Sequence, residues 1–193
     1  VEERDRIIEA FRSGKFERFS GSHTKYADYI EFNFLTGART SEVLGLRWEH
    51  INFKKNQIVF QEGKVMATNG GYGKGVQKKG LKTQTSRVFT MNDRISDLLL
   101  KRKESVKPIT LESNVFEDIN HASFRENAYR KVLTSLGIEY RKPYQTRHSF
   151  ITIMANQSSL KMHQIAKICG TSISVIENHY LDKNSGIEYL PEI

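Results

Sequence analysis

The sequence predicts an α+β domain that is mainly α, with one small antiparallel β-sheet in its first half. Two patterns carry this prediction. Apolar residues recur at helical spacing before residue 50 and again after residue 93, whereas the runs 57–61 and 86–90 are rich in β-branched and aromatic residues, as strands are. The length of 193 residues fits one full-sized domain, 1–193, which can bury a core without a disulfide or a metal.

Three short helices are expected before the first strand. An amphipathic helix is expected around residues 7–11 and should end before Gly14, where the pattern stops. A largely buried helix is expected over 26–35 and should end at Gly37. The segment 41–48 carries apolar residues at helical spacing, and we expect a third helix there.

The second half is expected to be helical. Asn92 or Asp93 should cap its first helix, because both side chains accept hydrogen bonds from free backbone amides. Ser123 and Glu126 have the spacing of a capping box, and Gly137 stands where the helix that they open should end.

Three further helices are expected near the C-terminus. Pro143 fits the first turn of a helix that runs through Met154. The last two helices should cover about 162–169 and 172–180, and Gly170 separates them.

The charge points to an anionic partner. The formal net charge is +8 and the sequence pI is about 9.5, which favours nucleic acid or an acidic membrane surface. No apolar run is long enough to cross a membrane, and no signal peptide is visible, so we expect no membrane association. Cys169 is the single cysteine, which excludes an internal disulfide and a Cys-based zinc site and indicates the reducing cytoplasm.

A glycine-rich, basic stretch separates the two predicted strands. Six of the 13 glycines fall within residues 63–80. The charged residues of 62–87 are the acid Glu62 and six bases: Lys64, Lys74, Lys78, Lys79, Lys82 and Arg87. The segment Gly73-Lys74-Gly75 lacks the Ser or Thr and the following helix of a P-loop. A basic hairpin suits contact with a phosphate backbone, and a solvated loop accounts for this segment equally well.

The segment 161–180 fits a helix-turn-helix unit, with Gly170 in its turn. A non-catalytic DNA-binding regulator is therefore the alternative function for this chain. Its second helix, however, offers no Lys or Arg, whereas Arg to guanine is the commonest specific base contact. Two helices that pack against each other around a glycine turn explain the segment better.

No metal site is evident, because the six histidines form no ligand pair with zinc-site spacing and no acidic cluster is visible. Phosphodiester chemistry without metal needs a nucleophile, a cationic clamp for the phosphate oxygens and an acid for the leaving oxygen. Arg39 and Arg147, each near a predicted helix start, could form the clamp. Lys82 could serve as the acid, and Tyr144, Tyr180 or one of several other tyrosines as the nucleophile.

Four segments together resemble the tyrosine recombinases of the phage integrase family. The run from Thr36 to Trp48 (TGARTSEVLGLRW) looks like the first signature box of this family, and the run 144–150 (YQTRHSF) looks like the second. The run 169–180 (CGTSISVIENHY) resembles the segment that ends in the nucleophile. The run 81–83 (LKT), followed four residues on by Arg87, is similar to the hairpin that carries the family's lysine. All four stand in the family's order.

The resemblance implies a helical tyrosine-recombinase-type catalytic domain and a site-specific recombinase or integrase activity. Tyr180 would attack the scissile phosphate to give a 3′-phosphotyrosyl link and a free 5′-hydroxyl, and a second strand would reverse the step without metal, ATP or another cofactor. Arg39 and Arg147 would bind the non-bridging oxygens, as forked guanidiniums do well. Lys82 would protonate the leaving 5′-oxygen. Glu42, three residues after Arg39, would orient that arginine.

The chain departs from the family pattern at two positions. Tyr144 stands where the second box usually begins with histidine, and Thr171 stands at a later His or Trp position; both keep a hydroxyl that can hydrogen-bond phosphate. His148 is expected to be a packed, supporting residue of its helix rather than a catalytic base. Besides Lys82, the lysines Lys74, Lys78 and Lys79 are expected to contact DNA, and Lys78 and Lys79 are also alternatives for the role of the acid.

The resemblance also implies partners and context. We expect double-stranded DNA as the partner, a homotetramer in the synaptic complex and a monomer when free, in the cytoplasm of a bacterial or phage system and associated with the nucleoid. Members of the family generally carry an N-terminal helical domain that clamps the opposite face of DNA, and nothing in this chain matches it. We therefore expect the chain to be the catalytic domain of a longer protein.

Overall fold

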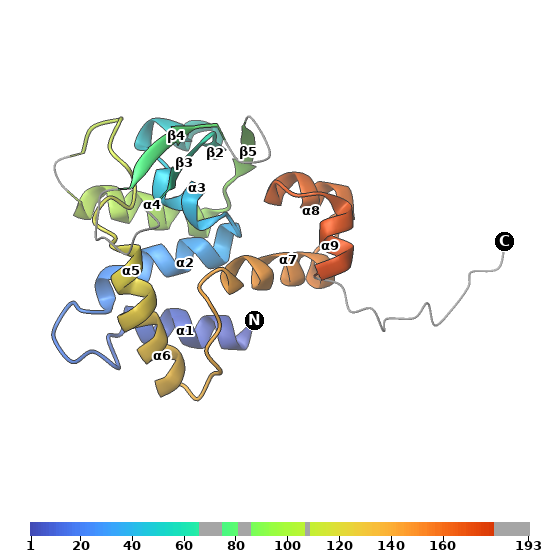
Figure 1. The fold of residues 1–193 in the computed structure, drawn as a ribbon. Helices are drawn as coiled ribbons and strands as arrows, with labels where there is room; N and C mark the ends of the chain where they lie inside the picture. Colours follow the sequence, from blue (N-terminus) through green and yellow to red (C-terminus); the bar gives the residue numbers. More distant parts are fainter. Residues whose placement is uncertain (66–74, 81–85, 107–108, 180–193) are drawn as a thin grey trace, which may run out of the picture.

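The computed structural model describes residues 1–65, 75–80, 86–106 and 109–179, which form a helical body with strands at one end (Figure 1). The helices are α1 (Glu2–Arg12), α2 (Ala27–Thr36), α3 (Thr40–Gly45), α4 (Asp93–Ser105), α5 (His121–Ser123), α6 (Arg130–Ser135), α7 (Gln145–Gln157), α8 (Met162–Cys169) and α9 (Ile173–His179). Short 3₁₀ segments are η1 (Thr24–Tyr26), η2 (Trp48–His50) and η3 (Phe53–Lys55), and η4 (Phe124–Tyr129) is a π-helix. The strands are β1 (Ile51–Asn52), β2 (Gln57–Phe60), β3 (Glu62–Val65), β4 (Val76–Lys79) and β5 (Arg87–Thr90). The predicted fold class is confirmed.

The strands form two small antiparallel sheets. One has the order β1-β2-β5, with Ile58 opposite Phe89 and Phe60 opposite Arg87. The two strands predicted over 57–61 and 86–90 are therefore confirmed. The other sheet is the hairpin β3-β4, in which Glu62 lies opposite Lys79. The sequence predicted a single sheet and left the segment between the two strands as a hairpin of unspecified pairing.

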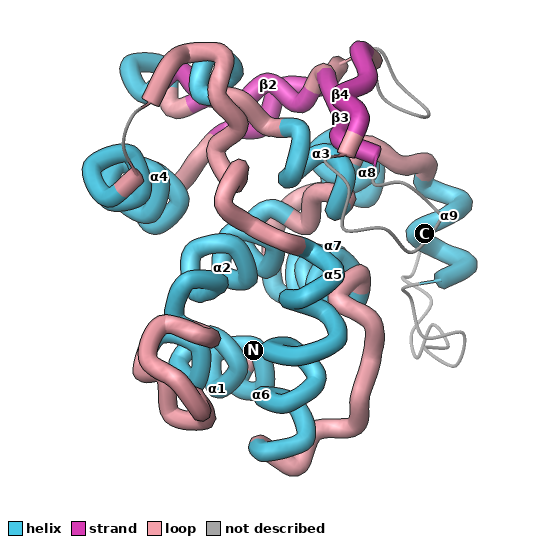
Figure 2. Tube along the Cα trace, turned by 60° about the vertical axis from the view of Figure 1, so that its left-hand side comes forward, coloured by secondary structure: helices cyan, strands magenta, loops and turns pink. Residues whose placement is uncertain are grey.

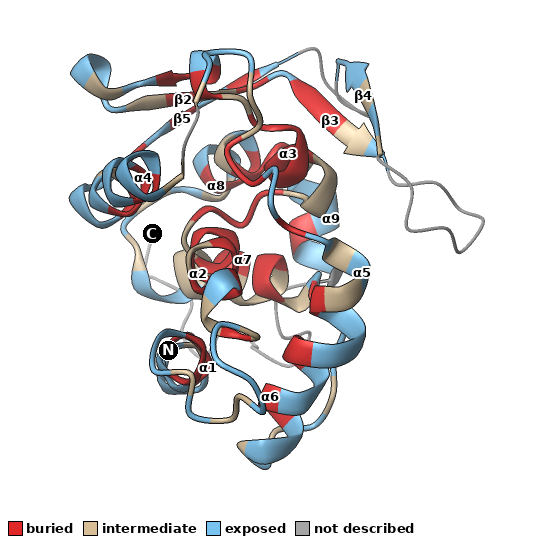
Figure 3. Cartoon of the chain, turned by 90° about the vertical axis from the view of Figure 1, so that its left-hand side faces the viewer, coloured by how far each residue is buried: buried red, intermediate tan, exposed pale blue. Residues whose placement is uncertain are grey.

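The core lies around α2, which is buried along most of its length (Figure 3). Figure 2 shows α2 and α7 between the strand-bearing end and the pair α1 and α6. Phe124 is fully buried and makes ring contacts with Phe11, Tyr26 and Tyr29. This burial of large aromatic side chains supplies much of the hydrophobic stabilisation that joins α1, α2 and η4.

Helix α2 ends at Gly37, as predicted. Gly37 has φ +57°, in the left-handed region, and donates its N–H to the carbonyl of Asn33 at 3.0 Å. A Cβ at this position would lie 2.4 Å from Cδ1 of Phe150 on α7. Glycine is therefore required here both by the backbone conformation and by the close approach of α7.

The predicted helix over 41–48 is wrong in its C-terminal part, because α3 ends at Gly45. Leu46 and Arg47 are extended, and the Leu46 carbonyl accepts the N–H of Val115 at 2.8 Å. Arg47 forms an antiparallel bridge with Asn114. Hydrogen bonds to a distant segment thus replace the last helical turn, which local apolar spacing could not indicate.

The predicted capping box at Ser123 and Glu126 is also wrong. The helical segment begins at His121. Its cap is Asn120, three residues before Ser123, and the Asn120 side chain accepts the N–H of Ser123 at 2.9 Å. Glu126 instead pairs with Arg125. The predicted end of this segment is confirmed: Gly137 has φ +70°, and the N–H of Ile138 bonds the Leu133 carbonyl.

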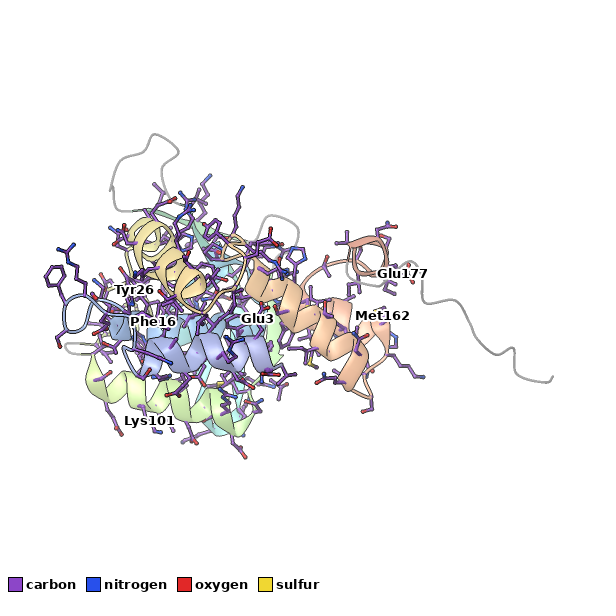
Figure 4. All side chains as sticks on the ribbon, turned by 90° about the horizontal axis from the view of Figure 1, so that it is seen from below. Glu3, Phe16, Tyr26, Lys101, Met162 and Glu177 are labelled. Carbon is purple, nitrogen blue, oxygen red and sulfur yellow. The ribbon has the colours of Figure 1, made fainter. Side chains whose placement is uncertain are left out.

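Helix α7 packs against α2, and the last two helices, α8 and α9, follow it at one side of the body. Figure 4 shows Met162 on α8 and Glu177 on α9 at the opposite end of the molecule from Phe16 and Tyr26. Helices α8 and α9 are joined at Gly170, which has φ +64°, as the predicted helix pair requires. Among the described residues, no helix is both long and apolar enough to span a membrane.

Candidate active site

Arg39 stands at the start of α3, immediately after the turn that ends α2. Its backbone is extended, and the Glu42 carboxylate accepts its backbone N–H at 2.9 Å. The same carboxylate accepts Nη1 of Arg39 at 2.9 Å. One acidic residue of the first turn therefore holds both the main chain and the guanidinium of Arg39.

Arg147 lies in the first turns of α7 and is almost fully buried, with 1% of its surface exposed. Its Nη1 donates to the carbonyl of Gly37 at 2.8 Å, which fixes α7 against the turn that leads into Arg39. Its Nε is buried and has no hydrogen-bond partner among the described residues. The structure thus brings Arg147 to the segment that carries Arg39.

The C-terminal end of α8 completes this region. Nη2 of Arg39 donates to the Gly170 carbonyl at 2.7 Å. Thr171 follows directly, and its N–H bonds the carbonyl of Ala166 at 3.0 Å in the turn that ends α8. Thr171 is half-buried. Gly170, 131 positions after Arg39 in the chain, thus bonds to it, and Thr171 lies close by as the next residue.

Arg87 is a residue of this region to which the sequence analysis assigned no role in the site. It is the first residue of β5 and is buried. Its Nη2 donates to Oε2 of Glu42 at 2.7 Å, and its Nε donates to the Ile168 carbonyl at 3.0 Å. The sequence offered two signals for Arg87, its place in the basic stretch and its place four residues after the run 81–83, and neither predicted a buried arginine.

Glu42 is buried between the two arginines and remains acidic. Burial acts to raise the pKa of Glu42, but its hydrogen bond and charge interaction with Arg87, followed by those with Arg39, outweigh this effect and lower the pKa below its usual value. The carboxylate is therefore ionised at neutral pH and keeps both guanidiniums in place.

Cys169 is buried at the end of α8 near these charges and was also not predicted as a site residue. Burial raises the pKa of its thiol to about 11, while the positive charges of nearby arginines act in the opposite direction. The arginines within electrostatic range of this one thiol are Arg147, Arg87 and Arg39. The neutral thiol is buried at the end of α8, within electrostatic range of these arginines.

Tyr144, the first residue of the run 144–150 singled out in the sequence, precedes α7 and is exposed over 43% of its surface. Its ring meets the ring of His148 edge-on, with centroids 5.4 Å apart. His148 is half-buried one helical turn later. The phenol hydroxyl is therefore accessible, and the imidazole supports its ring.

The hairpin β3-β4 lies against α3 and brings two of the predicted DNA-contacting lysines to Arg39. A Cβ on Gly45 would lie 2.8 Å from the backbone of Gly63, so the two glycines permit this close packing. Gln77 ties the hairpin to α3 by donating to the Gly45 carbonyl at 2.8 Å. A cavity of about 430 Å³ between α3 and the hairpin is lined by Arg39, Ser41, Glu42, Gly63, Val65, Lys78, Lys79 and Gly80.

Three predicted site residues lie outside the described residues: Lys74, Lys82 and Tyr180. Helix α9 ends at His179, the residue directly before Tyr180. Among the residues that the structure does describe, no group of three or more His, Cys, Asp or Glu side chains could hold a metal ion.

The arrangement suits an anion that accepts several hydrogen bonds. Arg39 lines the cavity together with the exposed residues Lys78 and Lys79. Arg147 comes from a distant part of the chain and bonds the carbonyl of Gly37, two residues before Arg39. Arginine matches the geometry of phosphate oxygens, and a buried cation gains most from an anion in a site of low dielectric.

Solved structures share this fold. The Tn1549 transposon integrase in complex with a circular intermediate DNA matches with a TM-score of 0.74 at 16% identity, over 95% of this chain and 61% of that chain. The XerH site-specific recombinase bound to difH substrate matches with a TM-score of 0.62 at 18% identity, over 94% and 50%. The catalytic domain of bacteriophage HP1 integrase matches with a TM-score of 0.55 at 17% identity, over 92% and 83%.

The chain thus spans less than two thirds of the length of the transposon integrase and XerH chains. The search among curated proteins finds no match. A family model gives the decisive result, since the model described as "Phage integrase family" matches residues 2–186, which include every box singled out in the sequence. With this match and the shared fold, the chain belongs to the phage integrase family.

Proposed function

We propose that residues 1–193 are the catalytic domain of a site-specific DNA recombinase, which cuts and rejoins DNA strands through a covalent tyrosine intermediate. The observation that carries this proposal is the burial of Arg147 beside Gly37. Among the described residues, no carboxylate balances its positive charge: its Nη1 bonds a neutral carbonyl and its Nε has no partner. A buried cation costs several kcal/mol unless an anion compensates it, and a DNA phosphate is such an anion.

The reaction follows from the chemistry of the proposed groups. The Tyr180 oxygen bonds to the scissile phosphorus, the bond to the 5′-oxygen breaks, and the tyrosine proton is lost. Lys82 gives a proton to the departing 5′-oxygen, so the strand ends in a free 5′-hydroxyl. Attack by another 5′-hydroxyl on the phosphotyrosine reverses the step. The number of phosphoester bonds is unchanged, so no ATP is consumed.

The described residues supply the electrostatic part of this reaction. Arg39 and Arg147 bind the non-bridging oxygens, whose charge grows as the tyrosine attacks. Glu42 holds Arg39 by two hydrogen bonds and so orients the clamp. Tyr144 and Thr171 each add a hydroxyl that can donate to the same phosphate.

Duplex DNA is the partner in this proposal. The transposon integrase and XerH chains of the same fold are each described in complex with DNA. Lys74, Lys78 and Lys79 would neutralise backbone phosphates next to the scissile one. We further propose a monomer when free and a tetramer in the synapse, where two duplexes exchange strands, in the nucleoid of a bacterial or phage-infected cell.

The alternative of a non-catalytic regulator that reads DNA with α8 and α9 is not favoured. Arg39 and Arg87 bind carbonyls at the end of α8, so this helix pair is tied to the proposed clamp. The pair also packs on the body through Ile165, Cys169 and Ile176, which are buried.

The proposal is tested by capture of the covalent intermediate. Wild-type protein is incubated with DNA fragments that flank its coding region, each nicked at intervals so that the short leaving strand dissociates and cleavage is trapped. Adducts are then recovered under denaturing conditions and sequenced. We expect a discrete cleavage site with wild-type protein and none with Tyr180→Phe. The control is Tyr140→Phe, which removes the hydroxyl of a half-buried tyrosine whose ring contacts Tyr129 and Arg130.

Two results would count against the proposal. An adduct that persists in Tyr180→Phe would assign the nucleophile elsewhere. DNA binding by wild-type protein without any adduct would favour the regulator.

A further inference from the structure

Arg87 has no role in the proposed chemistry, yet it is among the most constrained side chains near the clamp. It opens β5 opposite Phe60 and is 6% exposed. Its guanidinium carbon lies 4.4 Å from the centroid of the Phe60 ring, so the aromatic face covers one side of the fork. The side chain therefore has little freedom to take another orientation.

The two edges of this guanidinium hold two different elements. Nε donates to the Ile168 carbonyl near the end of α8 at 3.0 Å. Nη2 donates to Oε2 of Glu42 on α3 at 2.7 Å. A planar fork can make both bonds at once, whereas the single ammonium of a lysine cannot reproduce this geometry.

Through Glu42, the position of Arg87 bears on Arg39. Oε2 of Glu42 accepts both the Arg87 guanidinium and the backbone N–H of Arg39, and Oε1 accepts Nη1 of Arg39. Without Arg87, the buried carboxylate would lose a partner that holds it ionised, and its rotamer would no longer be fixed. Arg39 would then lose the support that aims its guanidinium.

Through α8, Arg87 also affects the placement of Thr171. Arg87 binds the carbonyl of Ile168 and Arg39 binds that of Gly170, so two guanidiniums hold the negative end of this helix. Thr171 follows at once. The same arginine therefore fixes the two sides between which a phosphate would bind.

We propose that Arg87 is a positioning residue for DNA strand cleavage, which sets the orientation of the Arg39 guanidinium through Glu42 and the place of Thr171 through the end of α8. This inference rests on the function proposed above. Arg87 itself is not required to touch the phosphate.

The test compares the substitution of Arg87 with that of a second buried arginine that makes the same kinds of contact elsewhere in the molecule. Arg87→Lys keeps the charge and removes the fork. Arg102→Lys is a matched control, because Arg102 is equally buried, donates its Nε to the Val115 carbonyl at 2.7 Å, pairs with Asp118 and lies 4.6 Å from the Phe116 ring centroid.

Adduct formation is measured on the trapped cleavage site with two scissile linkages, the normal phosphodiester and a methylphosphonate. In the methylphosphonate a methyl group replaces one non-bridging oxygen and removes the negative charge of the linkage, so the second substrate depends less on an arginine clamp. Arg39→Ala serves as the reference for loss of the clamp itself.

We expect Arg87→Lys to slow phosphodiester cleavage about 10- to 100-fold, as misplacement of a reacting group does, with substrate binding little changed. On the methylphosphonate, the loss should shrink to about threefold or less, as for Arg39→Ala, because the misplaced charge no longer matters. Arg102→Lys should have near wild-type rates on both linkages.

The inference would be overturned if Arg87→Lys lost equal activity on both linkages, or cleaved as fast as Arg102→Lys does. Should Arg87→Lys fail to fold in a thermal melt, Glu42→Gln must show the linkage-dependent loss instead, and its absence would also overturn the inference. If wild-type protein gives no Tyr180-dependent adduct, the proposed function fails and not merely the role of Arg87.

Discussion

Arg147 donates a hydrogen bond of 2.8 Å to the carbonyl of Gly37, a residue 110 positions earlier in the chain. The bond joins the start of α7 to the turn between α2 and α3, and Phe150, one turn after Arg147, covers the same glycine. This one contact brings together the two arginines of the proposed clamp, because Arg147 donates the bond and Arg39 lies two residues after Gly37, which accepts it. The integrity of this turn should decide both stability and cleavage.

Replacement of Gly37 tests how tightly Phe150 packs on this turn. We expect Gly37→Ala to lower the free energy of unfolding by about 2–4 kcal/mol, because φ +57° disfavours alanine and the new Cβ would meet Phe150 at 2.4 Å. Gly137→Ala is the control: its φ is +70°, but no atom lies within 4 Å of the new Cβ, so a loss of about 1 kcal/mol is expected. Urea unfolding measures both values. Equal losses would show that the contact with Phe150 is not tight.

The sequence predicted those features that depend on local signals. Gly37 and Gly170 mark helix ends because only glycine readily adopts positive φ, and both ends are where the sequence placed them. The end of α3 was missed because the bond between Val115 and Leu46 is made by a segment far away in the chain. No local pattern reports such a bond.

The same distinction holds in the site. Arg39 and Arg147 could be proposed from their motifs, whereas Arg87 was counted with the lysines of a basic stretch. Whether an arginine is exposed or buried depends on what packs over it, and Phe60 and the end of α8 do so only in the folded chain. Its pairing with Glu42 is likewise invisible in the sequence, since 45 positions separate them.

Arg147 should contribute to cleavage but little to stability. Its burial costs desolvation energy that one hydrogen bond to Gly37 only partly returns. We expect Arg147→Met, which fills a similar volume without charge, to change the free energy of unfolding by less than about 1 kcal/mol while reducing adduct formation by at least about 100-fold. Urea unfolding and the trapping assay measure the two effects. A large loss of stability with retained cleavage would contradict this role.

The stability of the protein should fall as the pH drops below about 6.5, in part because of His121. Burial, helped by the positive charge of Arg125, lowers the pKa of His121 to about 4. Its Nδ1 lies 3.1 Å from the hydroxyl of Tyr29, and its ring contacts Phe124. In the unfolded chain His121 has the ordinary histidine pKa of about 6.5. Between about pH 6.5 and pH 4 the unfolded chain therefore binds a proton at His121 that the folded chain does not, so acid favours unfolding.

His121→Gln should reduce this dependence. Glutamine can still bond Tyr29 but does not titrate, so the variant should lose less unfolding free energy than wild type between about pH 7.5 and pH 4.5. His23 and His50, whose pKa values are also lowered by burial, would leave a residual slope. His163→Gln, at an exposed position of α8, is the control. Parallel curves for wild type and His121→Gln would refute the assignment.

Lys78 and Lys79 should each contribute to DNA binding through charge. Both are exposed on β4 and line the cavity that Arg39 reaches. We expect the double substitution Lys78→Ala and Lys79→Ala to reduce the slope of log affinity against log salt by up to about two, since each lysine displaces about one counterion from a phosphate. Fluorescence anisotropy with a labelled duplex of arbitrary sequence measures the slope, because this term does not depend on sequence.

A matched pair of lysines separates a local contact from the effect of net charge. Lys54 and Lys55 are also adjacent and exposed, but they lie just before Gln57, the first residue of β2. Arg87 pairs with Phe60, at the other end of this strand. The double substitution of Lys54 and Lys55 removes the same two charges and should leave the slope nearly unchanged, because a phosphate beyond about 10 Å is screened from them. Equal slopes for the two double variants would mean that the hairpin is not placed on the DNA and that the affinity reflects overall charge alone.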